Sequence, residues 1–490
     1  MKPADLFDRN AEWADLERFV TSEAPGLRIG VLYGRRRLGK SFLLRRLAQA
    51  HHGIYHMAVE EEQGPALQRF VDSVGMARGL NRGDLAVRDW EHALRQALSG
   101  PEPLVVIDEL PYLLAHAQGA SIPSLLQQMV DESRSADQPE KKRVILCGSA
   151  LAVMSELLSG SKPLRGRAEL DLLLRPFDYR TVAGYYGIED PETAFRLYSI
   201  FGGVPGYRDL LGARSPQTLS ELEELVLETV CNPSHALFTE PAYLLREDPR
   251  IRDRALYFSI LSAVAAGAKT PSKIGGVVGR DARSLAHPLE VLISAGFLTR
   301  EEDLLVQRRP SLRVSDRIVQ FHDLVVSPRL SLFEDRRPGP AWQDSQTSLR
   351  TQLYGPAFEA LAREWVRRYA REETLGGAVG EVGTTVVNDS REKAQHEVDV
   401  LALAAGQRKW AARPVVRVIG EAKDADRVRT ASDVDRLEKI RSLLTGKGVE
   451  ASGAKLMLFA RSGFSPDVEQ AAAGREDLEL VDLPRIHSGG

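Results

Sequence analysis

Cysteine is nearly absent from this chain of 490 residues, which has only Cys147 and Cys231. Neither stands in a C-x-x-C pair or a Cys/His cluster, so the sequence argues against a disulfide framework and structural zinc. No run of about eighteen apolar residues occurs, and the N-terminal MKPADLFDRNAEW lacks an apolar core, so neither a spanning helix nor a signal peptide is predicted. We therefore expect a cytoplasmic protein without membrane contact.

A strong charge of one sign is also missing, because 65 Lys and Arg residues stand against 68 Asp and Glu residues and leave a net charge of −3. This balance argues against a uniformly basic coat, so any nucleic-acid contact must come from a local patch. The length and the 43% hydrophobic content allow about two to four domains with cores of their own.

What the sequence does contain is an apolar strand at residues 29–32 that runs into the pattern G-x-x-x-x-G-K-S. Its glycines let backbone N–H groups converge on phosphate at a helix N-terminus, its lysine reaches the β- and γ-phosphates, and its hydroxyl binds Mg²⁺. A chance glycine-rich turn is the alternative. The pattern predicts an ATP site with Ser41 as a Mg²⁺ ligand, formed by Gly34, Arg35, Arg36, Arg37, Leu38, Gly39, Lys40, Ser41 and Phe42.

A second apolar strand, residues 104–107, ends in an acidic pair. We expect Asp108 to hold Mg²⁺ through its water shell and Glu109 to polarise the attacking water, because γ-phosphoryl transfer needs positioning and charge neutralisation. Alone, the pair would more simply cap the next helix. Together with the phosphate loop it predicts ATP hydrolysis.

Three further residues near this site have two interpretations each. Ser149 follows a strand at residues 144–147 and would either contact the γ-phosphate or only cap a helix. Arg165 and Arg167 lie in the basic loop PLRGR and are candidate arginine fingers, supplied by a neighbouring subunit of a homo-oligomer. Ordinary surface arginines are the alternative.

The chain up to residue 179 alternates apolar strands with helical stretches, which predicts a parallel sheet flanked by helices in an ATPase domain. The expected strands are residues 29–32, 54–58, 104–107, 144–147 and 170–174. Residues 180–249 read as a helical lid. Within it, the turn Gly203–Pro205 would lie against the adenine ring or merely break a helix.

Residues 250–332 read as a winged helix: a helix, a short helix from Ser272, a longer helix at 284–295, and a hairpin at 296–314. Such a domain can insert a helix into the major groove of DNA, but the fold also serves protein contacts. The locally basic residues are Lys273, Arg280, Arg283, Arg308, Arg309 and Arg313.

The polar, Pro-rich segment 333–349 predicts a linker to a last domain, residues 350–490. Side chains alternate along its strands, so pairing two of them would gather Asp399, Glu421 and Lys423 around one divalent ion. Asp399 and Glu421 would bind Mg²⁺, with Mn²⁺ as an alternative, and the lysine would orient or deprotonate a water that attacks a phosphodiester. Charges on the wet side of an antiparallel sheet are the other interpretation.

This set, an aspartate followed after a gap by E-x-K, resembles the core of the restriction-endonuclease-like (PD-(D/E)xK) superfamily. In this chain the residues are Asp399, Glu421, Ala422 and Lys423. The superfamily often takes a further glutamate from its first helix, and Glu359 in GPAFEALAREW matches that position by order and face.

Other segments carry a resemblance over nearly the entire chain: FDRNAEW, VVIDELPYLL, LCGSA, PLRGR, FGGVPGY and LRVSDRIVQF. With the phosphate loop and the C-terminal set, they resemble the archaeal-type ATPase family on the STAND side of the AAA-related NTPases. The resemblance implies a multidomain α/β fold: a P-loop parallel sheet with helical lid, a winged helix-turn-helix domain, and an α/β restriction-endonuclease-like domain. It also places Arg9, Glu12 and Pro205 near the base of ATP, although Asp8 stands where the family has glycine.

We expect an ATP-dependent switch coupled to a Mg²⁺-dependent nuclease on DNA, a function suited to defence or mobile-element biology. DNA would be bound through the winged helix and the C-terminal domain. The alternative is an ATPase-driven DNA-binding or signalling regulator whose nuclease-like domain is not catalytic. A third class, a scaffold ATPase whose winged helix binds protein, would not bind DNA in a salt-dependent way.

Overall fold

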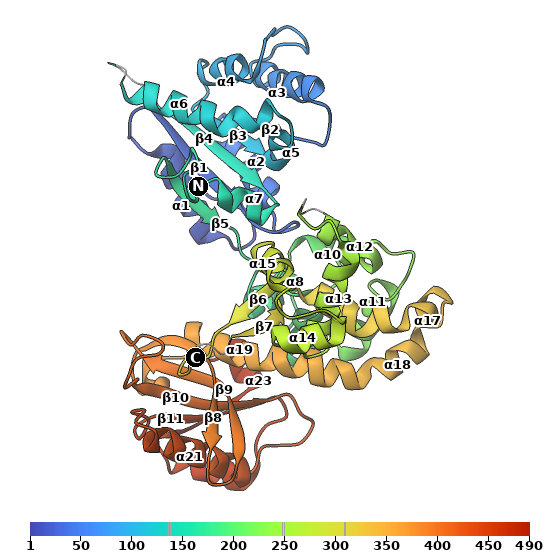
Figure 1. The fold of residues 1–490 in the computed structure, drawn as a ribbon, viewed down its shortest axis with the longest axis vertical. Coiled ribbons are helices and arrows are strands. Elements are labelled where there is room, and N and C mark those ends of the chain that lie inside the picture. The colour runs from blue at the N-terminus through green and yellow to red at the C-terminus, as the bar shows by residue number, and fades with distance from the viewer. Residues whose placement is uncertain (136, 138–139, 247, 249, 308–309) are drawn as a thin grey trace. The chain divides into compact units, whose positions relative to one another are not determined.

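The computed structural model describes residues 1–135, 137, 140–246, 248, 250–307 and 310–490. The chain forms two compact units (Figure 1). The first consists of Met1–Pro176, Val204–Tyr207 and Arg246–Pro249. The second consists of Phe177–Gly203, Arg208–Leu245 and Arg250–Gly490.

A five-stranded parallel sheet with the strand order β2-β3-β4-β1-β5 forms the centre of the first unit. All five strands predicted from apolar runs are present, with ends that differ by a few residues. β1, β3 and β4 lie inside the sheet and are largely buried, which is why continuous apolar runs identified them, whereas the edge strands β2 and β5 are partly exposed. The strands are β1 (Leu27–Tyr33), β2 (Ile54–Met57), β3 (Leu104–Asp108), β4 (Lys142–Gly148) and β5 (Ala168–Leu173).

Helices cover both faces of this sheet, each with its own apolar core. On one face, Leu16 and Leu44 pack with Val106 and Ile145. Leu16 lies on α1 (Asn10–Thr21) and Leu44 on α2 (Lys40–Ala50), whereas Val106 and Ile145 lie on β3 and β4. The core on the other face includes Phe70 and lies between the strands and five helices. These are α3 (Gln63–Ala77), α4 (Trp90–Leu98), α5 (Leu110–Leu114), α6 (Ile122–Arg134) and α7 (Leu151–Glu156), with the short η1 (Gly119–Ser121) before α6. This is the three-layer α/β arrangement that the sequence predicted.

The second unit begins with a helical region and continues into three helices and an antiparallel hairpin, labelled in Figure 1. The helical region contains α8 (Tyr179–Tyr186), α9 (Pro191–Phe201), α10 (Gly206–Leu210), α11 (Leu219–Glu228) and α12 (Ala236–Arg246). Gly206 and Tyr207 of α10 and Arg246 of α12 belong to the first unit. The next elements are α13 (Arg254–Ala265), α14 (Pro271–Val278), α15 (Ala286–Ser294), β6 (Leu298–Glu301) and β7 (Ser311–Val314).

The segment predicted as a linker, residues 333–349, contains a helix. Proline at its first turn is compatible with a helix start, because the missing N–H would have no partner there. That helix is α18 (Pro338–Ser348). Short helical elements lie before and after it: α16 (Arg317–Phe321), η2 (His322–Val326), η3 (Ser327–Arg329), α17 (Leu330–Glu334) and η4 (Leu349–Tyr354).

A mixed sheet with the order β12-β11-β10-β9-β8 forms the C-terminal domain. The first three strands are parallel, and β10, β9 and β8 are antiparallel. The two alternating strands that the sequence analysis paired are β9 and β10, and no strand expected from the sequence corresponds to β12. The elements are α19 (Gly355–Arg368), α20 (Glu372–Leu375), β8 (Val379–Asp389), β9 (Ala394–Ala404), β10 (Val416–Lys423), α21 (Ala431–Gly446), β11 (Lys455–Ala460), α22 (Pro466–Ala473), β12 (Leu478–Asp482) and α23 (Leu483–Ser488).

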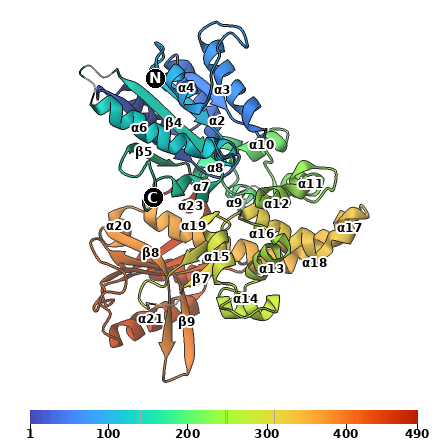
Figure 2. The ribbon, with the colours of Figure 1, turned by 45° about the horizontal axis from the view of Figure 1, so that its top comes forward.

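The connection between β6 and β7 is built into this C-terminal domain. Leu304, 4% exposed, lies in the apolar core beside residues of β8 and β9, and its N–H donates to the main-chain oxygen of Thr384 at 3.0 Å. Asp303 is also buried and accepts hydrogen bonds from Thr385 Oγ1 (2.8 Å) and Val386 N (3.2 Å). The hairpin is therefore fixed at its far end. The long β8–β9 hairpin to which it is attached is orange in Figure 2.

None of the described helices combines the length and the apolar composition needed to cross a bilayer.

Candidate functional sites

The phosphate loop joins the carboxyl end of β1 to α2. Arg37 (φ 64°) and Gly39 (φ 88°) are both left-handed, so the chain turns sharply before the first helical residue, Lys40. A Cβ on Gly34 would lie 2.6 Å from the main-chain oxygen of Leu174, which explains the glycine. Lys40 is 4% exposed, and its Nζ donates to the main-chain oxygen of Arg35 at 3.0 Å.

The side chains that follow occupy the first turn of α2. Ser41 is half-buried, whereas Phe42 is exposed and lies under the Arg46 guanidinium. Among the other loop residues, Leu38 is buried and Arg36 is exposed. The loop thus presents the lysine and the hydroxyl at a helix N-terminus, the geometry that binds phosphate and Mg²⁺.

Two segments distant in sequence contact the loop backbone. Arg9 is 5% exposed, pairs with Glu12 at 3.0 Å, and donates from Nη2 to the main-chain oxygen of Leu38 at 3.3 Å. Pro205 precedes Gly206, whose N–H donates to the main-chain oxygen of Arg37 at 3.0 Å. Both sequence-predicted base-side residues therefore lie on segments that contact the phosphate loop.

Asp108 ends β3 with no exposed surface. Its Oδ1 accepts the main-chain N–H of Glu109 at 2.9 Å, and its Oδ2 accepts the hydroxyl of Tyr55 at 2.6 Å. Tyr55 was missed at the sequence level, because it lies on β2 in a segment that only predicted a weak strand. Both oxygens of this carboxylate are held by the protein.

Glu109 and Ser149 are joined directly. Glu109 has a left-handed backbone (φ 52°), and its Oε2 accepts from Ser149 N at 3.1 Å and Ser149 Oγ at 3.0 Å. The sequence placed both residues at the same edge of the sheet but did not predict this contact.

The two candidate fingers have partners in their own chain. Arg167 forms a two-point ion pair with Asp131 on α6, with N–O distances of 2.9 and 3.2 Å. Arg165 donates from Nη1 to the main-chain oxygen of Gly160 at 2.7 Å. Arg165 is exposed and Arg167 is partly exposed, so either can leave its partner at a modest cost.

In the C-terminal domain, antiparallel pairing of β9 and β10 brings Asp399, Glu421 and Lys423 together as the sequence predicted. Lys423 Nζ lies 3.1 Å from Asp399 Oδ2 and 2.8 Å from Glu421 Oε1. Asp399 Oδ2 also accepts the N–H of Ala422 at 3.0 Å. Asp399 is 6% and Glu421 2% exposed, so two carboxylates are buried beside one lysine.

The electrostatics of this cluster reflect crowded negative charge. Burial and the neighbouring Asp399 raise the pKa of Glu359 on α19 to about 7, and the same two causes raise the pKa of Glu421. Burial opposes the charge of Lys423, but Asp399 and Glu421 outweigh it and raise the pKa of Lys423 to about 12. The lysine therefore stays protonated at neutral pH, which favours orienting a water over deprotonating it.

Two arginines complete the surroundings of this cluster, and the sequence analysis missed both. Arg436 on α21 lies 3.3 Å from Glu421 Oε1. Arg363 on α19 is buried and donates to the main-chain oxygen of Asp399 at 2.8 Å. Glu421 Oε2 is buried without a hydrogen-bond partner within the part of the chain that the structure describes. An orphaned carboxylate oxygen beside two further carboxyl groups fits a divalent cation.

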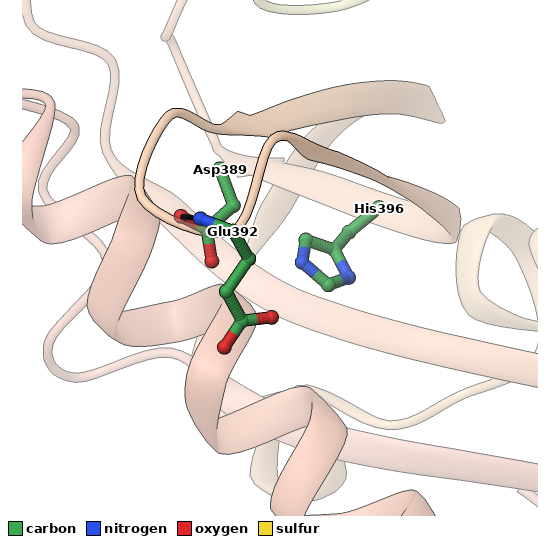
Figure 3. A group of neighbouring side chains, drawn as sticks. All are labelled: Asp389, Glu392 and His396. Atoms are coloured by element: carbon green, nitrogen blue, oxygen red, sulfur yellow. Dashed lines mark hydrogen bonds between the residues drawn. The ribbon is translucent and has the colours of Figure 1, made fainter.

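A second group with metal-ligand chemistry lies where the β8–β9 hairpin turns (Figure 3). Ligand atoms of Asp389, Glu392 and His396 lie within 4.8 Å of one another. Lys439 on α21 lies 3.2 Å from Asp389 and also pairs with Glu392. The lysine already supplies the positive charge that these carboxylates need, so the group reads as a structural contact between hairpin and helix.

The locally basic residues of the α13–β7 segment divide into two sets. Arg313 pairs with Glu301 of the neighbouring strand at 2.8 Å, so it belongs to the hairpin itself. Lys273, Arg280 and Arg283 are exposed around α14 and the loop after it. Arg308 and Arg309 lie outside the described residues.

The N-terminal fold and site define a P-loop ATPase: a parallel sheet with its phosphate loop after β1 and an acidic pair after β3. Residues 6–207 match a family model described as the ATPase domain predominantly from Archaea. The N-terminal part of the chain is therefore a P-loop ATPase domain that binds and hydrolyses ATP.

Over most of its length the chain is similar to an uncharacterized protein of Methanocaldococcus jannaschii, with 23% identity over 448 residues covering 89% of this chain and 94% of the relative. Among solved structures, the ORC2 protein of Aeropyrum pernix, determined with ADPNP and ADP, aligns at 14% identity and TM-score 0.43, covering 70% of this chain and 97% of that protein.

Two further solved structures align less well. A STAND protein with a tetratricopeptide repeat sensor from Pyrococcus horikoshii gives 16% identity and TM-score 0.29, covering 75% of this chain and 50% of that one. Cdc6p from Pyrobaculum aerophilum gives 12% identity and TM-score 0.33, covering 68% and 96%.

Proposed function

We propose that this protein couples its ATPase to a Mg²⁺-dependent nuclease centred on Asp399, Glu421 and Lys423. The observation that carries the proposal is the burial of both carboxylates, on adjacent strands, beside one lysine and with an oxygen of Glu421 left without a partner among the described residues. Buried charges are costly unless they are paired or bind metal, and Lys423 and Arg436 both contact Oε1 of Glu421, which leaves its Oε2 for a metal ion.

In this proposal Asp399 and Glu421 hold the cation, which would neutralise charge on the scissile phosphate and activate a water. Lys423, protonated at neutral pH, orients that water and stabilises charge on the phosphate. Glu359 lies on α19 beside Asp399 and takes part as the additional carboxyl group. Arg363 holds the backbone of β9 at Asp399 and so fixes the position of this ligand.

The three helices and hairpin at residues 254–314 follow the order of a winged helix, and we propose that this module contacts DNA. Lys273, Arg280 and Arg283 supply exposed positive charge on α14 and the loop that precedes α15. Backbone phosphates are attracted to such clusters even where the whole chain carries little net charge. The far end of the hairpin is attached to β8, so α14 and α15 rather than the wing would carry the contact.

For the ATPase reaction itself we propose the following roles. Ser41 and Asp108 hold Mg²⁺, Glu109 polarises the attacking water, and Ser149 orients Glu109 and contacts the γ-phosphate. Arg9 and Pro205 lie toward the base of ATP. Arg165 or Arg167 would reach a neighbouring subunit's site in a homo-oligomer, after leaving its present partner.

The second candidate function is an ATPase-driven regulator whose C-terminal domain binds nucleic acid without cutting it. The position of Lys423 between the two carboxylates favours it, since a metal ion must enter against that ammonium group.

One experiment separates these functions: cleavage of plasmid, linear duplex and single-stranded DNA with Mg²⁺ or Mn²⁺, with and without ATP. The matched variants are Lys423→Ala, Lys40→Ala and the control Lys439→Ala, which removes another lysine that pairs with two carboxylates in the same domain. Cutting that is lost in Lys423→Ala but kept in Lys439→Ala supports the nuclease, and Lys40→Ala then shows whether ATP controls it. Equal cutting by all variants would mean a contaminant, and no cutting with normal ATP hydrolysis would favour the regulator.

A further inference from the structure

The hydroxyl of Tyr55 is the donor to one oxygen of Asp108, at 2.6 Å. The other oxygen accepts from the main-chain N–H of Glu109 at 2.9 Å, and Asp108 has no exposed surface. The plane of the carboxylate is therefore fixed from both ends. Each oxygen keeps a lone pair that can accept from a Mg²⁺-bound water.

Tyr55 is itself held between two elements of the ATP site. It lies on β2, which runs parallel to β3, and the N–H of Ala58 at the end of β2 donates to the main-chain oxygen of Asp108 at 2.9 Å. The guanidinium of Arg45 lies 5.0 Å from the centre of its ring. Arg45 stands one helical turn after Ser41 on α2, so the tyrosine touches the helix of one proposed Mg²⁺ ligand and the carboxylate of the other.

We propose that Tyr55 is a positioning residue of the ATPase, which orients the Asp108 carboxylate for Mg²⁺. The proposal rests on the role of Asp108 proposed above. Partners that orient metal-binding groups from the next layer typically change metal affinity or activity by about 10- to 100-fold when removed. The effect should therefore appear in the Mg²⁺ dependence, more than in the affinity for ATP.

The direct test is Tyr55→Phe, which keeps the ring and removes only the hydroxyl. ATP hydrolysis is measured against Mg²⁺ concentration at fixed ATP, and then against ATP at saturating Mg²⁺. We expect the Mg²⁺ concentration for half-maximal activity to rise about tenfold, with KM for ATP within about twofold of the wild type. The control is Tyr186→Phe, which removes a buried hydroxyl without a hydrogen-bond partner among the described residues. It should leave both curves unchanged.

A cycle with Asp108→Asn separates the two claims. Mg²⁺-dependent binding of a fluorescent, non-hydrolysable ATP analogue is measured for both single variants and the double variant. Tyr55→Phe alone leaves the buried carboxylate of Asp108 without its hydroxyl donor, which can impair folding. In the double variant the side chain at position 108 is uncharged, so the double variant can fold even where Tyr55→Phe does not. If Tyr55 acts through Asp108, adding Tyr55→Phe to Asp108→Asn causes no further loss.

The outcomes are distinguishable. Tyr55→Phe with wild-type Mg²⁺ dependence, or equal losses with and without Asp108→Asn, would overturn the role of Tyr55 alone. Asp108→Asn with wild-type Mg²⁺ dependence would instead remove the assignment of Asp108 on which the proposal rests.

Discussion

The carboxylate of Glu109 is bound to Ser149 by two hydrogen bonds, from the main-chain N–H at 3.1 Å and from Oγ at 3.0 Å. Glu109 follows β3 and Ser149 follows β4, which are neighbours in the sheet. Glu109, the candidate base, and Ser149, the candidate contact of the γ-phosphate, are thus joined, so a substitution of either residue should change the position of the other.

We expect Ser149→Ala to lower kcat for ATP hydrolysis about tenfold, with KM for ATP changed by less than about twofold. A hydrogen bond to a charged group contributes about 1.5–3 kcal/mol, and this one sets the direction of the Glu109 carboxylate. Steady-state hydrolysis measures both constants, with Ser155→Ala on α7 as control. A faster Ser149→Ala enzyme would mean that Ser149 holds Glu109 away from the attacking water.

Removal of Lys423 should make the C-terminal domain depend on metal for stability. Lys423→Met leaves Asp399 and Glu421 buried with less positive charge, so we expect a lower Tm without metal and a larger rise on adding Mg²⁺ than in the wild type. Thermal unfolding with EDTA or Mg²⁺ tests this independently of cutting. A variant whose Tm rose on adding Mg²⁺ by no more than the wild-type Tm would argue against a metal site at these carboxylates.

Charge removal around α14 should weaken DNA binding and its salt dependence together. For Lys273→Gln, Arg280→Gln and Arg283→Gln combined, we expect the slope of log K against log salt to fall by about three if all three contact phosphates. ATP hydrolysis without DNA should remain normal. The control is Lys447→Gln, an exposed lysine in the C-terminal domain. An unchanged slope would place the DNA contact elsewhere or remove it.

The stability of the N-terminal unit should fall in mild acid through His56. Burial and then Arg69 lower its pKa from 6.5 to about 4 in the folded protein. Between these values the unfolded chain binds a proton that folded His56 does not, so stability is lost as pH falls from 6.5 towards 4. The loss is at most about 3 kcal/mol.

Unfolding free energies of the wild type, His56→Gln and the exposed control His287→Gln, measured between pH 7 and pH 4.5, test this sign. The fall with acid should be smaller in His56→Gln than in the other two proteins. Identical pH profiles in all three would show that His56 contributes nothing to it.

Arg167→Ala and Asp131→Ala distinguish a finger from a surface ion pair. If Arg167 serves a neighbouring site, its removal should slow ATP hydrolysis most at high protein concentration, where oligomers form, whereas Asp131→Ala frees the arginine and preserves hydrolysis. Rates over a concentration series provide the measurement. Normal rates for Arg167→Ala at every concentration would mean that Arg167 only forms the surface ion pair with Asp131. Such a pair contributes about 0–1 kcal/mol to stability.

Local patterns in the sequence identified the elements whose chemistry is local. The phosphate loop has fixed spacing, and the central strands of the first sheet contain continuous apolar runs, so both were predictable. Alternation also placed Glu421 and Lys423 on one face of a strand, and the pairing of β9 with β10 that the sequence analysis supposed brings Asp399 beside them. The role of Tyr55 was not predictable, since its partner Asp108 lies more than fifty residues away and nothing around Tyr55 signals a polar contact.

Long-range packing also explains the remaining differences. Arg313 was counted among the locally basic residues, and it pairs with Glu301 across the hairpin. Strand β12 is short, and its sequence LELVD alternates too briefly to signal a strand. Docking of Asp303 and Leu304 against β8 depends on a surface that folds more than seventy residues later in the chain.

That docking sets where the protein can be divided. A fragment beginning at residue 350 would lack Leu304, and its removal from a core typically costs about 2–5 kcal/mol. It would also leave the hydroxyl of Thr385, 2% exposed as a residue, without Asp303 as acceptor. Proteolysis or expression at the apparent boundary should therefore yield a poorly folded C-terminal piece, and an independent piece that contains the carboxylate cluster must also include Asp303 and Leu304.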